Sequence, residues 1–125
     1  MKSILLFLGL LVVASGQIIR VDFPQDTIDT SGSLTPWVEI DNTGNEATSY
    51  NLQVDIQHGD TSFTGSCWST SIIKAGETSM HWPWAIKVTS DMPKGSYDVT
   101  VTLFGGYCGR NAVDTMTTQN AFTIL

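Results

Sequence analysis

The side chains best suited to binding chemistry in this 125-residue chain are its four tryptophans. Trp82 and Trp84 stand two positions apart, so on a β-strand both indoles project to one face. A pair of exposed indoles can stack on sugar rings or clamp an apolar partner. Positions of the same parity around them are also apolar, at Met80, Ile86 and Val88. We therefore expect both indoles to fill the core beneath a sheet, with an exposed platform as the alternative.

Pro83 lies between these two indoles and bears on their burial. A proline cannot donate a hydrogen bond to a sheet, so its strand is expected at a sheet edge or at a bulge. A bulge there would bury Trp82 and turn Trp84 outwards. We predict that Trp82 is the more buried of the two.

Two further aromatic residues are candidates for an exposed binding site. Trp37 falls on the polar parity of its predicted strand, so its indole is expected to face solvent. Tyr107 lies in a glycine-rich loop that would form a binding tip. The candidate binding residues are therefore Trp37, Trp82, Trp84 and Tyr107.

Catalysis finds little support in the sequence. His58 lies in a Gly-Asp turn and His81 stands beside a tryptophan, and no motif places either with a nucleophile and a carboxylate. We expect no enzymatic activity and no cofactor. We expect no metal site either, because Cys67 and Cys108 stand too far apart for zinc-ligand spacing.

Cys67 and Cys108 are the only two cysteines. An even number of cysteines in an exported chain favours a disulfide, and this one would close a loop of about 40 residues. The alternative is a buried strand cysteine and a separate loop thiol, because sequence does not show whether the two Cβ atoms meet.

The first 16 residues have the three parts of a secretory signal peptide: a charged Lys2, an apolar run over 4–13, and the small residues 14–16. The apolar run is shorter than the roughly 18 to 20 residues of a membrane anchor, which is the alternative. We predict cleavage after Gly16, secretion, and no membrane span in the mature chain. Residues 17–125 are then one domain with a single core.

The charge of the chain argues against a nucleic-acid partner. Its formal net charge is −6, with 12 acidic and 6 basic residues. Phosphate binding needs clustered cations, whereas the basic residues of the predicted mature chain are scattered singly. They are Arg20, Lys74, Lys87, Lys94 and Arg110.

Alternation of apolar and polar residues predicts an all-β chain. After the signal peptide, no window of ten or more residues has apolar side chains at helical spacing. The predicted strands lie at 19–23, 34–41, 50–57, 63–73, 80–88, 97–103 and 122–124. About seven short strands in a chain of this length indicate an immunoglobulin-like antiparallel β-sandwich.

Three features of this arrangement are expected to stand out. Residues 34–56 should form two strands folded back on one another through the turn at 41–45, where asparagine, aspartate and glycine reverse the chain. The strand at 97–103 has the cleanest alternation and should be central in a sheet. The longest irregular loop is expected at 105–118.

The order of the turns resembles CARDB-type immunoglobulin-like modules. The segments that carry the resemblance are Val38-Glu39-Ile40-Asp41-Asn42-Thr43-Gly44, Ala75-Gly76-Glu77-Thr78, Pro93-Lys94-Gly95-Ser96-Tyr97-Asp98-Val99 and Asn120-Ala121-Phe122-Thr123-Ile124. The resemblance covers about residues 33–125 and implies a β-sandwich used for adhesion or as a spacer, with no catalytic residues.

A second, weaker resemblance is to the ML lipid-recognition family. It is carried by the signal peptide, the domain size, the Ala75-Gly76-Glu77 turn and the Pro-x-Gly-x-Tyr segment that ends at Tyr97. It would imply a lipid carried between the two sheets. That family usually has more disulfides, including one near the N-terminus, and no cysteine precedes Cys67 here.

The sequence thus favours a secreted, non-enzymatic immunoglobulin-like module for binding or adhesion. Its partner would be an extracellular protein or carbohydrate. A secreted lipid-binding or lipid-transfer protein of the ML type is the alternative, so the partners also include lipid.

Overall fold

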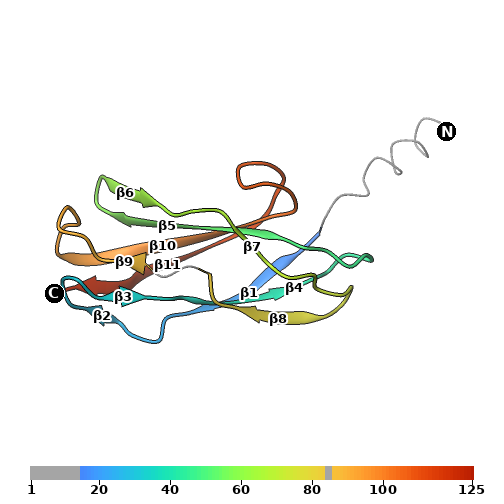
Figure 1. The fold of residues 1–125 in the computed structure, drawn as a ribbon, viewed down its shortest axis with the longest axis horizontal. Coiled ribbons are helices and arrows are strands. Elements are labelled where there is room, and N and C mark those ends of the chain that lie inside the picture. Colours follow the sequence, from blue (N-terminus) through green and yellow to red (C-terminus); the bar gives the residue numbers. More distant parts are fainter. Residues whose placement is uncertain (1–14, 84–85) are drawn as a thin grey trace.

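The computed structural model describes residues 15–83 and 86–125, which form an all-β structure (Figure 1). In chain order the strands are β1 (Gln17–Asp22), β2 (Thr27–Ile28), β3 (Ser33–Leu34), β4 (Trp37–Asp41), β5 (Asn51–His58), β6 (Thr61–Thr64), β7 (Trp68–Ser69), β8 (Thr78–His81), β9 (Ile86–Lys87), β10 (Gly95–Phe104) and β11 (Ala112–Ile124). None of the described residues belongs to a helix long and apolar enough to cross a membrane.

The strands form two layers, which confirms the predicted immunoglobulin-like sandwich (Figure 1). The larger layer has the order β2-β11-β10-β5-β6, with β7 also paired to β5. The smaller layer has the order β1-β4-β8. A short β3–β9 ladder continues the β4–β8 pair of this layer. In the sequence β3 comes just before β4, and β9 comes after β8. All the strand pairs are antiparallel except the one between β11 and β2.

The prediction that residues 34–56 form a hairpin is wrong, although both of its strands exist. β4 pairs with β1 and β8, whereas β5 pairs with β10, β6 and β7 in the other layer. The turn at 41–45 therefore carries the chain from one layer to the other. Alternation identifies the apolar face of a strand but not its partner, and both strands bury that face in the shared core.

β10 lies in the middle of the larger sheet between β5 and β11, as its alternation predicts. Tyr97 of β10 and Phe122 of β11 stack with ring centroids 5.1 Å apart and planes 2° from parallel. Burying apolar surface stabilises a fold by about 25 cal/mol for each Å² removed from water, so the inner face of this sheet is a main source of stability. Its fully buried members include Leu52, Val54, Val101 and Leu103.

The prediction of a long irregular loop at 105–118 is also wrong, because β11 already begins at Ala112. The pairing of β10 with β11 shifts register twice, between Tyr97 and Val99 and again between Leu103 and Phe104. Asn120, within β11, has a positive φ of 51°. The first shift adds two residues to β11 around Asn120, and the second adds one and exchanges the two faces of the strand, so β11 lacks the unbroken alternation by which sequence identifies a strand.

A register shift in β1 likewise alters the predicted facing of its residues. The pairing with β4 shifts between Ile18 and Arg20, so Ile18 is buried and Ile19 is exposed. The backbone N–H of Ile18 donates a 2.7 Å hydrogen bond to the Asp114 carboxylate on β11. This bond joins the two layers at the start of the domain.

Asn42 fixes the end of β4. It is fully buried, and its side-chain amide donates 2.8 Å hydrogen bonds to the carbonyls of Glu46 and Ile73, while its Oδ1 accepts from the Gly44 N–H. Its backbone N–H donates to the carbonyl of Glu77. One side chain thereby satisfies the turn after β4 and the segment that leads into β8.

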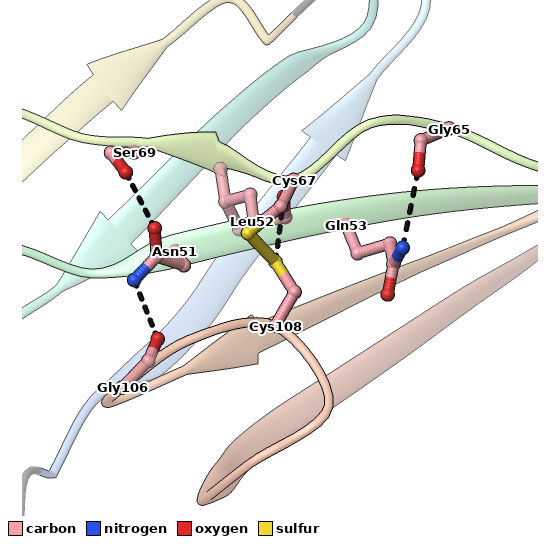
Figure 2. The surroundings of a disulfide bond; sticks show 8 residues. All are labelled: Asn51, Leu52, Gln53, Gly65, Cys67, Ser69, Gly106 and Cys108. Carbon is pink, nitrogen blue, oxygen red and sulfur yellow. Dashed lines mark hydrogen bonds between the residues drawn. A yellow bond between two sulfur atoms is a disulfide. The ribbon is translucent and has the colours of Figure 1, made fainter.

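Cys67 and Cys108 form a disulfide, as predicted, with their Cα atoms 5.8 Å apart. Figure 2 shows that it crosses the beginning of β5 and joins the residue before β7 to the loop between β10 and β11. Asn51 makes a parallel connection, because its side chain accepts from the Ser69 hydroxyl and donates to the carbonyl of Gly106. The β10–β11 loop is therefore anchored to the sheet at two neighbouring points.

Replacing Asn42 tests its importance for the fold. Asn42→Asp removes both amide donors and turns a carboxylate towards two carbonyl oxygens, so we expect a loss of at least about 3 kcal/mol in the free energy of unfolding at pH 7. Asn45→Asp, at an exposed position of the same turn, is the control and should change it by less than about 0.5 kcal/mol. Urea denaturation measures both, and equal effects would contradict the role of Asn42.

Removing the disulfide should destabilise the domain through the unfolded state. For a sequence separation of 41 residues, loop-closure entropy gives about 4 kcal/mol. We expect the double variant Cys67→Ala, Cys108→Ala to lose about this amount in guanidinium denaturation. If the oxidised wild type and the double variant had the same free energy of unfolding, the disulfide would not constrain the unfolded chain.

Candidate binding site on the outer face of the smaller sheet

The alternation along β4 places one tryptophan outside the sandwich. Val38 and Ile40 are buried, while Trp37 is 41% exposed and Glu39 is partly exposed on the other face. This confirms the predicted exposure of Trp37. The strand separates core from solvent by the period of two that its sequence shows.

The end of β8 reverses the prediction for the tryptophan that follows this strand. His81 is buried opposite Val38, and the next residue, Trp82, is 54% exposed. The expectation that Trp82 fills the core is therefore wrong. Trp84 lies outside the described residues, so the predicted order of burial of Trp82 and Trp84 stays a prediction.

The physical reason for this reversal is one extra residue on the β8 side of the ladder. Between the pairs Leu34/Ile86 and Val38/His81, one segment has the residues 35–37 and the other has 82–85. An extra residue changes the parity of all that follows it. One unbroken alternation therefore does not run from Trp82 to Ile86. The buried positions Ile86 and Val88 consequently do not predict which way Trp82 faces.

Trp37 and Trp82 meet on the outer face of β4 and β8. Their ring centroids lie 5.9 Å apart, and the ring planes make an angle of 71°. This edge-to-face arrangement is a preferred geometry for aromatic pairs. The structure thus brings together two of the four sequence-predicted site residues.

Charged side chains border the two indoles on β1 and β4. Asp22 pairs with Trp37 across the β1–β4 ladder, and Arg20 and Glu39 form the next pair on the same face, two residues along. The Nε of Arg20 lies 3.1 Å from the Asp22 carboxylate and 3.6 Å from that of Glu39. We call these five residues, Arg20, Asp22, Trp37, Glu39 and Trp82, the tryptophan face.

The three charged members were not identified from sequence as part of the site. Arg20 and Asp22 share the outward parity of β1, and Glu39 shares that of β4 with Trp37. Their parity was a usable signal, but their proximity depends on the pairing of β1 with β4, which the sequence does not specify.

The opposite side of β8 carries a buried histidine. His81 is 6% exposed and contacts the edge of the Trp68 ring, with centroids 5.6 Å apart. Its Nε2 has no hydrogen-bond partner among the described residues. Burial disfavours the charged imidazolium and lowers the pKa of His81 below its ordinary value of 6.5.

Tyr107 is separate from the tryptophan face. Its side chain is 79% exposed in the loop between β10 and β11, next to the disulfide and on the larger layer. The tryptophan face belongs to β1, β4 and the end of β8, on the smaller layer (Figure 1). These two candidate surfaces therefore do not form one site.

A small apolar pocket lies between the layers, where a lipid carrier would need its cavity. It encloses about 190 Å³ and is lined by Ile56, Phe63, Thr64, Gly65, Ile86, Lys87, Thr89 and Met92. Small-molecule sites have volumes of about 300 to 1,000 Å³. This pocket falls below that range.

The described residues contain no group of three or more histidine, cysteine, aspartate or glutamate side chains able to hold a metal ion. The carboxylates of Asp22 and Glu39 instead lie against the guanidinium of Arg20. The chemistry available on the tryptophan face is therefore aromatic stacking and hydrogen bonding at charged groups.

No family model and no curated protein matches the chain. Several solved structures have a similar fold. The CARDB domain of a Pyrococcus furiosus protein, in complex with di-metal ions, has a TM-score of 0.57 at 15% identity, over 88% of this chain and 90% of that one. The sporulation control protein of Bacillus subtilis has a TM-score of 0.56 at 14% identity, over 90% of this chain and 50% of that one.

Larger enzymes contain a similar domain. A β-glucosidase from Erythrobacter marinus has a TM-score of 0.65 at 12% identity, over 90% of this chain and 16% of that one. The chain thus spans only a small part of such enzymes, and identities this low show the fold alone. The fold is CARDB-like, and the resemblance to the ML family has no support among the structural neighbours.

The buried His81 should make stability depend on pH. Because its folded-state pKa is lowered, the unfolded chain takes up a proton first as the pH falls through about 6.5, and the free energy of unfolding then falls by up to about 1.4 kcal/mol per pH unit. This component is fully present above about pH 7.5 and is lost below it, until the folded-state pKa is reached.

Urea denaturation of wild type and His81→Leu at pH 7.5 and 5.5 measures this component. Leucine cannot be protonated, so the variant should lose less stability between the two pH values than wild type. Carboxylate titration is common to both proteins and cancels in the comparison. An equal loss in both proteins would contradict this account of His81.

Proposed function

We propose that this chain is a secreted, non-enzymatic immunoglobulin-like binding module, and that the tryptophan face contacts its partner, an extracellular protein or carbohydrate. One observation carries the proposal: Trp37 and Trp82 are both exposed, to 41% and 54%, and contact each other on the outer face of the sandwich. Exposed aromatic clusters are typical of recognition surfaces, because their apolar area gains most when a partner covers it.

The interior of the domain supports this assignment of the two indoles. The core is filled from both layers by aliphatic residues together with Tyr50, Tyr97 and Phe122, without either indole. Neither tryptophan is therefore needed as a core residue. A role in binding accounts for two large apolar side chains at solvent-facing positions.

Secretion is supported by the disulfide and by the N-terminal signal pattern. Disulfides persist in oxidising compartments and are rare in the cytosol. At the predicted cleavage site, the Tyr50 hydroxyl donates a hydrogen bond to the Ser15 carbonyl, and Gly16 packs against Tyr50. Cleavage after Gly16 would remove both contacts and leave Gln17, the first residue of β1, as the new N-terminus.

The absence of catalysis remains part of the proposal, and the positions of the histidines favour it. His58 makes a 2.8 Å hydrogen bond through Nδ1 to the carbonyl of Ser96 and lies against the Tyr97 ring. His81 is buried against Trp68. Neither belongs to the tryptophan face.

The lipid carrier remains the alternative function. The pocket of about 190 Å³ described above is by itself smaller than such a role requires. Extraction of the purified protein with organic solvent, followed by mass spectrometry, distinguishes the two. Stoichiometric lipid in the extract would favour the carrier.

The binding function is tested on an array of immobilised glycans and extracellular proteins. The fluorescently labelled predicted mature protein should bind a subset of spots, and Trp37→Ala with Trp82→Ala should abolish that binding because both contact surfaces are truncated. Ile72→Ala is the control, because it also removes an exposed apolar side chain but one outside the tryptophan face, and it should bind as wild type does.

Thermal denaturation of the same variants separates binding from folding. An exposed indole contributes little to the core, so Trp82→Ala should lower the free energy of unfolding by less than about 1 kcal/mol, against about 3 to 5 kcal/mol for a buried one. On the array, binding of the double variant as strong as that of wild type would overturn the assignment of the tryptophan face.

A further inference from the structure

The angle between the two indoles limits the shape of a ligand. With planes 71° apart and centroids separated by 5.9 Å, Trp37 and Trp82 form a corner rather than a flat platform. A flat, crystalline surface would contact only one of the two ring faces. A single flexible chain can stack one unit on one indole and lie against the other.

The border of this corner offers hydrogen bonds. Directly opposite residues in an antiparallel pair have Cβ atoms about 4.5 to 5.5 Å apart, so Asp22 is the cross-strand neighbour of Trp37. Arg20 and Glu39 form the next cross-strand pair on the same face. Carboxylate oxygens accept from hydroxyl groups, and guanidinium N–H groups donate to them.

The contact between Arg20 and the two carboxylates positions these groups in advance. Its Nε lies 3.1 Å from Asp22 and 3.6 Å from Glu39, and the side chains of Arg20 and Asp22 are about half exposed. A ligand rich in hydroxyl groups meets donors and acceptors already held next to an aromatic surface. Less side-chain freedom is then lost on binding.

Charge sets a further limit on the ligand. Two carboxylates and one guanidinium give the tryptophan face a formal charge of −1, and the whole chain carries −6. An anionic ligand would be repelled by both the site and the chain. Uronic acids and sulfated sugars are therefore disfavoured.

The same charges favour a sugar over a protein. Residues that dominate protein interfaces lie in well-packed, desolvated pockets. A protein seated on these indoles would have to desolvate Arg20, Asp22 and Glu39, at a cost that packing must exceed. Sugar hydroxyls form hydrogen bonds to such groups while the apolar face of the ring stacks on an indole.

We propose that the tryptophan face binds a single chain of a neutral oligosaccharide, stacking one pyranose ring on one indole while Asp22, Glu39 and Arg20 bond its hydroxyl groups. The proposal rests on the proposed function, since it names the ligand class of the same face. It applies to soluble chains and excludes crystalline polysaccharide and acidic sugars.

Titration of the predicted mature protein with soluble hexasaccharides, followed by the indole N–H signals in nitrogen-15 NMR spectra, tests it. The neutral probes are cellohexaose, maltohexaose, mannohexaose and chitohexaose, and the anionic probe is hexagalacturonic acid. At least one neutral probe should shift the signals of Trp37 and Trp82. Hexagalacturonic acid at the same concentration should not shift them, and microcrystalline cellulose should not retain the protein.

Matched variants assign the effect to the site. Trp37→Ala and Trp82→Ala should each weaken binding of the neutral probe at least about tenfold, while Ile72→Ala, at an exposed apolar residue outside the tryptophan face, leaves it unchanged. The pair Asp22→Asn and Glu39→Gln removes two negative charges, so hexagalacturonic acid should gain affinity. Retention of the wild-type melting temperature shows that each variant is folded.

Three results would overturn the proposal: no shift with any neutral probe, tighter binding of the anionic probe by wild type, or neutral binding that both tryptophan variants retain. The array separates this failure from that of the proposed function. Tryptophan-dependent binding to proteins alone would refute the glycan ligand and leave the binding module standing, whereas binding independent of both tryptophans would refute both.

Discussion

The hydrogen bonds of the Asn42 side chain are the interaction on which the smaller sheet depends. This buried amide donates to the carbonyl of Glu46 in its own turn and to that of Ile73, 31 residues further along the chain, while its backbone pairs with the residues just before β8. The start of β8 is therefore set against the end of β4. From that register it follows that His81 faces the core and Trp82 faces solvent.

The tryptophan face is thus a consequence of pairing rather than of any one strand. Trp37 is exposed because β4 alternates cleanly, but its contact with Trp82 requires the β4–β8 register, and its charged border requires β1 on the other side. The extra residue after Trp82 separates this part of the strand from the apolar positions at Ile86 and Val88.

A shared fold leaves the function of this domain to be argued from its surface. Neighbours as different as a CARDB domain, a sporulation control protein and part of a β-glucosidase have the same sandwich at 12 to 15% identity. Folds of this kind support many unrelated activities, because the core that defines them is separate from the surface that binds. In this chain the candidate for such a surface is an exposed indole pair bordered by charges, on the smaller layer, whereas the disulfide-anchored loop belongs to the larger one.

The sequence by itself determined the β class, the two-layer sandwich, the disulfide, the central position of β10 and the exposure of Trp37. These follow from local alternation, composition and cysteine count, which a chain carries regardless of its partners. Only the tertiary structure decided that β4 and β5 lie in different layers, that β11 begins at Ala112, and that Trp82 meets Trp37 beside Asp22. Each of these depends on which strands pair and where an extra residue interrupts the pairing. Such choices are made by contacts between residues distant in sequence, because a shift of one residue exchanges the two faces of a strand.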